Sequence, residues 1–180
     1  PRPMPRTLLR AATVALGLAV TALPVAAQGG RGASPRDSAS ATVDGATVAV
    51  NYGSPSKRGR EIYGGLVPWG QVWRAGANEA TRLTTSKPLQ FGSTTVPAGS
   101  YSLFVLPQQD GKWQLVINKQ VGQWGTNYDQ SQDLARVPLT VTQVPASAER
   151  MTFAVEKKGN GGELALTWDR TRAAAAFTVK

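Results

Sequence analysis

Four polar side chains crowd the segment from residue 74 to residue 81: Arg74, Asn78, Glu79 and Thr81. A guanidinium can clamp a carboxylate or a phosphate with two parallel hydrogen bonds, and a carboxylate can act as a base or a ligand. In a purely structural alternative, Arg74 and Glu79 form a buried ion pair that fixes the loop, and Asn78 satisfies loose backbone groups. One carboxylate without histidine is little material for catalysis, so this segment predicts binding more than reaction.

The tightest group of basic residues precedes that segment, where Lys57, Arg58 and Arg60 flank Gly59. Such a cluster can bind a phosphate, an acidic glycan or the acidic face of a protein partner. A loop whose charges only face solvent explains the cluster equally well.

Aromatic side chains could form a stacking platform for sugars or other flat ligands. They are Tyr63, Trp69, Trp73, Trp113, Trp124, Tyr128 and Trp168. Trp113 and Trp168 fall in alternating apolar runs and are expected in the core, whereas Trp69 and Trp124 fall in predicted loops. The predicted binding or docking site therefore comprises Lys57, Arg58, Arg60, Trp69, Trp73, Arg74, Asn78, Glu79 and Trp124.

The chain contains no histidine and no cysteine. Their absence excludes Ser-His-Asp and Cys-His nucleophiles, redox dithiols and ordinary zinc or copper sites. Asp129 and Asp133 lack the spacing of a calcium loop, so we expect no metal and no cofactor. The sequence predicts a protein that is not an enzyme and has no catalytic residue.

The formal net charge is +9, from 20 Lys plus Arg against 11 Asp plus Glu. Most basic residues stand singly among acids, without the dense runs of a nucleic-acid-binding arm. We therefore expect no nucleic-acid partner.

The first 27 residues have the pattern of a membrane-directed segment. Arg2, Arg6 and Arg10 precede an uncharged apolar stretch over residues 11–27, which ends in small residues. The pattern fits a signal peptide cleaved after Ala27, or a retained hydrophobic helix that anchors the chain through residues 7–27. Both alternatives place the rest of the chain outside the cytoplasm, in the periplasm and membrane-anchored if the helix is retained. Residues 28–40 are predicted to be a flexible linker.

Residues 41–180 alternate between short apolar-periodic runs and turn signals. Asp44-Gly45 and Asp110-Gly111 are typical of hairpin turns. Strands are expected at 41–52, 80–86, 89–91, 94–96, 101–106, 113–118, 137–144, 151–155, 164–168 and, as a final edge strand, 173–179. A loop with one helical turn near residues 130–134 joins two of them. The fold class is therefore all-β, an antiparallel β-sandwich of about nine strands after one N-terminal hydrophobic helix.

Two motifs resemble the bacterial secreted family DUF2911. The first runs from Lys57-x-Gly59-Arg60 through Leu66-Val67-Pro68-Trp69-Gly70 to the string WRxGANEAT at residues 73–81. The second is Pro97-Ala98-Gly99-x-Tyr101-Ser102-Leu103-Phe104, followed by Tyr128-Asp129, Asp133 and Arg136-Val137. The chain departs from the expected pattern at Ser54, where the family would carry Arg. The resemblance, over residues 34–180, implies an extracytoplasmic β domain and no assigned activity.

These observations predict an extracytoplasmic, non-enzymatic accessory subunit that docks on the protein subunits of a membrane-embedded complex, such as a photosynthetic or respiratory assembly. One alternative is a secreted glycan- or anion-binding module that uses Trp69, Trp124 and the loop 57–60. Another is a carboxylate-dependent hydrolase around Glu79 and Asp133, which requires both carboxyl groups to face one cleft.

Overall fold

The computed structural model describes residues 34–180. The predicted signal peptide or anchor, with its hydrophobic helix, and the first part of the predicted linker lie outside the described residues. Within residues 34–180, no helix is long and apolar enough to cross a membrane. The described residues form ten strands, namely β1 (Arg36–Val43), β2 (Ala46–Gly53), β3 (Thr81–Thr85), β4 (Leu89–Phe91), β5 (Thr94–Val96), β6 (Gly99–Leu106), β7 (Gln114–Asn118), β8 (Asp133–Pro138), β9 (Thr140–Lys158) and β10 (Gly161–Val179). One 3₁₀ turn, η1 (Gln130–Gln132), precedes β8.

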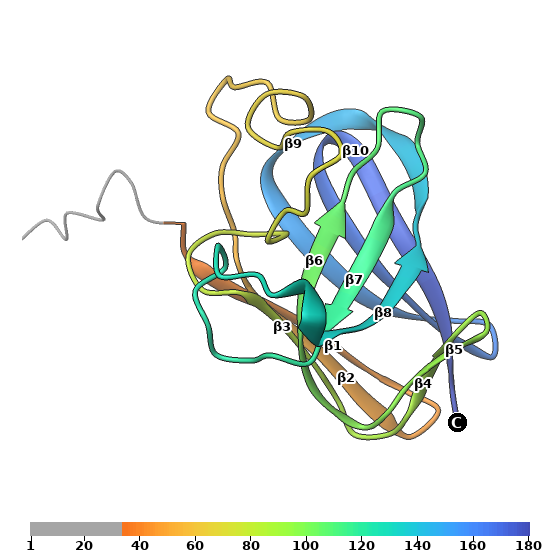
Figure 1. The fold of residues 1–180 in the computed structure, drawn as a ribbon. Coiled ribbons are helices and arrows are strands. Elements are labelled where there is room, and N and C mark those ends of the chain that lie inside the picture. Colours follow the sequence, from red (N-terminus) through yellow and green to blue (C-terminus); the bar gives the residue numbers. More distant parts are fainter. Residues whose placement is uncertain (1–33) are drawn as a thin grey trace, which may run out of the picture. The chain divides into compact units, whose positions relative to one another are not determined.

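The strands make two antiparallel sheets, which confirms the all-β prediction (Figure 1). One sheet has the order β1-β2-β3-β6-β7-β8, and the other has the order β5-β4-β10-β9. Both sheets contribute to one hydrophobic core: Leu83, Leu103 and Leu115 come from the first, and Leu89 and Leu166 from the second. The arrangement is that of a β-sandwich.

The predicted linker is wrong in its last part, because β1 begins at Arg36. The strand pairs along its whole length with β2, from Arg36 opposite Gly53 to Val43 opposite Ala46. Its side chains are mostly exposed, so no apolar alternation marks residues 36–40 as a strand. Backbone hydrogen bonds to β2 hold residues 36–40 in the strand, and such bonds do not require a side-chain pattern that the sequence would show.

The predicted strands 164–168 and 173–179 belong to one long strand, β10, which folds back on itself. The Oε1 atom of Glu163 lies 2.5 Å from Nη2 of Arg172, although a straight strand would hold these residues about 30 Å apart. A Cβ atom on Gly161 would lie 2.1 Å from the backbone oxygen of Phe177. The bend lies at Asp169, which has a positive φ of 53°. Residues 173–179 are also not an edge strand, because β10 lies between β4 and β9.

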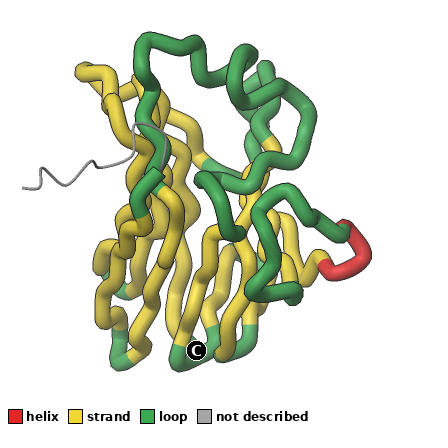
Figure 2. Tube along the Cα trace, turned by 90° about the vertical axis from the view of Figure 1, so that its left-hand side faces the viewer, coloured by secondary structure: helices red, strands yellow, loops and turns green. Residues whose placement is uncertain are grey.

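The long irregular segments gather at one end of the strands, and short turns close the other end (Figure 2). Residues 54–80 form the larger of these segments. It is anchored to β6, since Trp73 and Val105 exchange two backbone hydrogen bonds of 2.8 Å. The last pair between β3 and β6 is Thr81 opposite Leu103. Trp73 opposite Val105 continues this pairing along β6.

Candidate functional site

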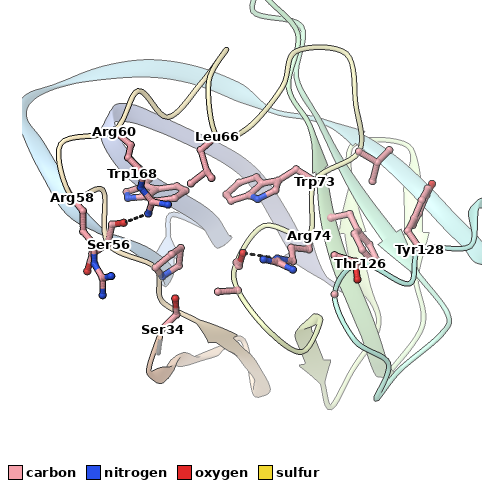
Figure 3. A pocket seen from close by; sticks show the side chains of 16 residues that line it. Ser34, Ser56, Arg58, Arg60, Leu66, Trp73, Arg74, Thr126, Tyr128 and Trp168 are labelled. Atoms are coloured by element: carbon pink, nitrogen blue, oxygen red, sulfur yellow. Dashed lines mark hydrogen bonds between the residues drawn. The ribbon is translucent and has the colours of Figure 1, made fainter. Parts of the chain in front are cut away.

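A pocket of about 490 Å³ lies among these loops (Figure 3). This volume is within the range of small-molecule sites, roughly 300–1,000 Å³. The lining combines arginine, hydroxyl and apolar side chains. The lining residues are Ser34, Pro55, Ser56, Arg58, Arg60, Leu66, Val72, Trp73, Arg74, Gly76, Ala77, Phe104, Gly125, Thr126, Tyr128 and Trp168.

The basic side of the pocket is fixed to the backbone of β9. The N–H of Met151 donates to the oxygen of Pro55 at 2.9 Å, and the N–H of Lys57 donates to the oxygen of Glu149 at 2.6 Å. Arg60 then closes the loop on itself, because its Nε donates to the oxygen of Lys57 at 3.0 Å and its Nη2 to the oxygen of Ser56 at 2.6 Å. These hydrogen bonds therefore hold the loop that carries Arg58 and Arg60 in one position against β9.

Two indole rings form part of the apolar side. The rings of Trp73 and Trp168 are nearly parallel, with an interplanar angle of 17° and centroids 5.9 Å apart. Tyr63 meets Trp73 edge-on at 6.5 Å, and Trp168 is almost fully buried. The bend of β10 at Asp169 brings Trp168 to the pocket, where Figure 3 shows it close to Trp73 and Leu66.

Arg74 is half-buried in the middle of the lining (Figure 3). Its Nε donates to the oxygen of Gly76 at 3.2 Å. Among residues 34–180, no carboxylate lies within ion-pair distance of its guanidinium. The Nη1 and Nη2 groups of Arg74 are therefore available to an incoming acceptor.

The predicted buried ion pair between Arg74 and Glu79 is wrong. Glu79 is largely exposed, and its Oε2 lies 3.6 Å from Nη1 of Arg36. Asn78 ties the loop together, as expected: its Nδ2 donates to the oxygen of Ser34 at 3.4 Å, and its backbone oxygen accepts the N–H of Gly125 at 2.9 Å. A positive φ of 64° suits asparagine at this position.

Of the nine predicted site residues, the structure brings Arg58, Arg60, Trp73 and Arg74 together in the lining. Lys57 instead binds the corner of β10, with Nζ 2.5 Å from Oδ1 of Asp169. This contact, with a hydrogen bond from the hydroxyl of Ser147, lowers the pKa of Asp169.

The remaining two tryptophans of the prediction also lie outside the lining. Trp69 is half-buried, where its ring stacks on Tyr63 at 6.2 Å and meets Trp113 edge-on at 6.1 Å. Trp124 has 49% of its surface exposed, which agrees with the prediction of a surface residue. The two therefore do not form a shared platform in the pocket.

Tyr128 belongs to a group of hydrogen-bonded side chains that was not predicted from the sequence. Its hydroxyl donates to Oδ2 of Asp133 at 2.7 Å and accepts from Nη2 of Arg136 at 3.0 Å. Nδ2 of Asn118 donates to Oδ1 of the same carboxylate at 3.0 Å. Burial, with the carboxylate of Asp133, raises the pKa of Tyr128 to about 12. The ring packs on Phe104 with centroids 4.8 Å apart, so this group fixes one wall of the pocket.

Among residues 34–180, no aspartate or glutamate lines the pocket. Glu79 is largely exposed outside it, and Asp133 is occupied by Tyr128, Arg136 and Asn118. This arrangement gives the hydrolase alternative no pair of carboxyl groups in the pocket. Within the described residues, no group of three acidic side chains could hold a metal ion.

The fold and the site thus define an antiparallel β protein with an arginine-lined pocket at one end of its two sheets. The chain belongs to the DUF2911 family, described as a protein of unknown function, whose model matches residues 34–177. No curated protein and no solved structure matches the chain.

Proposed function

We propose that this domain binds a small organic anion in the pocket around Arg74. The observation that carries the proposal is the guanidinium of Arg74, which lines the pocket without a carboxylate partner among residues 34–180. A half-buried cation without a counter-charge is a site that an anion stabilises. Arg60 adds a second guanidinium whose bonds within the described chain go only to backbone oxygens.

The composition of the lining favours an anion over a neutral glycan. Sugar hydroxyls require both acceptors and donors, and the lining residues of the described chain supply no carboxylate and no side-chain amide. Guanidinium groups are donors only and match the oxygens of carboxylates and phosphates. Trp73 and Leu66 offer apolar surface, so an organic anion fits better than a bare inorganic ion.

The proposal is tested with the full chain and a panel of probes: inorganic phosphate, benzoate and the neutral benzyl alcohol. Anions should raise the melting temperature and give saturable heats in titration calorimetry, whereas benzyl alcohol should do neither. Replacing Arg74 by Gln should weaken anion binding at least about tenfold, because it removes a charge-assisted contact.

A matched control is Arg82→Gln. Arg82 is exposed on β3, outside the pocket, and its loss lowers the net charge by the same amount. Binding in this variant should equal that of the unaltered protein. Equal losses in the two variants, or no binding of any anion, would overturn the proposal.

The role of accessory subunit in a membrane-embedded complex, outside the cytoplasm, remains a prediction. In this role, the loop after β7 would contact the other subunits, because Val121 and Trp124 in it have 47% and 49% of their surface exposed. Purification from native membranes in mild detergent, with the intact mass of the chain and of its stoichiometric partners, tests this role. Recovery of a chain that starts at Gln28 from the soluble periplasmic fraction would count against it.

A further inference from the structure

We infer that the organic anion carries two acidic groups, one at each end of an apolar body. This inference rests on the proposed function and narrows it from organic anions in general to elongated dianions. The pocket has guanidinium groups at two separate places, and apolar side chains lie between them.

The two guanidinium groups are held by different parts of the fold. Figure 3 shows Arg60 beside Ser56 at one side of the pocket, and Arg74 in the middle, towards Thr126. Arg60 belongs to the loop that is fixed to β9, whereas Arg74 bonds to the oxygen of Gly76 in the segment that precedes β3. Each guanidinium is therefore a separate position for an acidic group.

Both positions have donors left for an acidic group. Arg74 uses only Nε, which leaves Nη1 and Nη2, and Arg60 uses Nε and Nη2 on backbone oxygens, which leaves Nη1. Among residues 34–180, no carboxylate lies within ion-pair distance of either guanidinium. A monoanion bound to Arg74 would leave Arg60 to solvent, whereas a second acidic group could bind it.

Apolar side chains separate the two positions. In Figure 3, Trp168 lies on the side of Arg60, Trp73 lies above Arg74, and Leu66 lies between the two indoles. The two rings are nearly parallel, with centroids 5.9 Å apart, so their surfaces adjoin. A second charge next to the first would lie against this apolar surface and lose hydration without gaining a partner. A second charge at the far end of an apolar body avoids that cost.

The experiment is titration calorimetry of the full chain at about pH 7.5 with matched carboxylates. Terephthalate and suberate carry carboxylates at opposite ends, and benzoate and octanoate are the corresponding monoanions. Phthalate has the charge of terephthalate, but its carboxylates are adjacent. At least one of the two opposite-end dianions should bind at least about threefold more tightly than its monoanion, a modest gain because Arg60 is exposed. Phthalate should stay within about twofold of benzoate.

Two substitutions of Arg60 separate its charge from its place in the loop. Arg60→Gln should bring the opposite-end dianions to the affinity of their monoanions, with benzoate binding changed by less than about twofold. Arg60→Lys keeps the charge and loses the planar fork that bonds to two backbone oxygens, so it should keep the preference for dianions. Arg82→Gln, outside the pocket, should keep it as well.

Three results would overturn the inference and leave anion binding standing. Neither opposite-end dianion binds more tightly than its monoanion, phthalate gains as much as terephthalate, or the preference survives in Arg60→Gln. If no probe binds, the proposed function fails with it.

Discussion

Gly125 lets Arg74 take its place in the pocket. A Cβ atom at residue 125 would lie 2.7 Å from Cδ of Arg74 and 2.8 Å from the backbone oxygen of Asn78. Both distances are shorter than ordinary van der Waals contacts. The backbone N–H of Gly125 also donates to that oxygen of Asn78, so the two loops cannot separate without losing a hydrogen bond.

We therefore expect Gly125→Ala to impair anion binding without removing any lining functional group. The added methyl group should displace Arg74 or Asn78, lower anion affinity about tenfold, and cost about 1–3 kcal/mol of unfolding free energy. Titration calorimetry with benzoate measures the first effect, and urea unfolding measures the second.

The control for this prediction lies in the same loop. Gly122 has a positive φ of 82°, and a Cβ atom there would meet nothing within 4 Å. Gly122→Ala should cost about 1 kcal/mol through backbone strain alone and leave anion affinity unchanged. A parallel loss of affinity in the two variants would show that the loop acts through its general stability and not through Arg74.

The sequence indicates the part of the site that is local in the chain. Trp73 and Arg74 stand in a segment too polar and too glycine-rich for plain core, so the prediction found them. The prediction did not place Phe104 and Trp168 in the site, because they occupy strands, where an aromatic residue usually belongs to the core. Phe104 faces away from the main core and packs on Tyr128, and Trp168 reaches the pocket through a bend that residue types do not reveal.

At the scale of elements, the turns were predictable and the long hairpin was not. Asp44 and Gly45 both have positive φ, as a two-residue hairpin turn of type I′ requires, and an Asp-Gly pair is typical of such a turn. The fold-back of β10 depends instead on distant partners, namely Lys57 and Ser147 at Asp169. Periodicity reports which face of a strand is buried and gives no information about a bend held by other segments.

The ion pairs of Glu163 should be a main acid-sensitive contribution to the stability of the folded-back strand β10. Its carboxylate lies 2.5 Å from Nη2 of Arg172 and 2.9 Å from Nζ of Lys158. These hydrogen bonds lower its pKa, so the stabilisation is present above about pH 4.5 and is lost as the pH falls through the lowered pKa. Glu163→Gln should cost about 1.5 kcal/mol near neutral pH and much less near pH 3, measured by urea unfolding at both pH values.

Glu156 provides the comparison for that variant. It lies opposite Glu163 in the pairing of β9 with β10, and it is exposed. Glu156→Gln should change the unfolding free energy by less than about 0.5 kcal/mol at either pH. A loss of stability for Glu163→Gln that does not depend on pH would mean that packing, not the ion pairs, accounts for its effect.

For the whole molecule, histidine and cysteine are absent, and the groups whose pKa is shifted by the fold include carboxylates, which titrate in acid, and tyrosines, which titrate in alkali. All four tyrosines of the chain lie in the described residues, and burial raises the pKa of each: Tyr52, Tyr63, Tyr101 and Tyr128. A tyrosine whose pKa is higher in the folded state holds its proton more tightly there than in the unfolded chain. Its contribution to stability is complete below the unfolded value and is lost as the pH rises through the folded value.

The native protein should therefore show little tyrosinate at about pH 10, where the unfolded chain is half ionised. Absorbance near 295 nm measures tyrosinate directly, with the protein in urea as the unfolded reference. The free energy of unfolding should fall from about pH 10 upward, and Tyr128→Phe should flatten that fall because it removes a group with a folded pKa of about 12. The same substitution removes the hydrogen bonds to Asp133 and Arg136, so its stability should be lower than that of the unaltered protein at neutral pH. A native titration that matches the one in urea would mean that these rings are open to solvent, and the wall that Tyr128 and Phe104 give the pocket would not exist in solution.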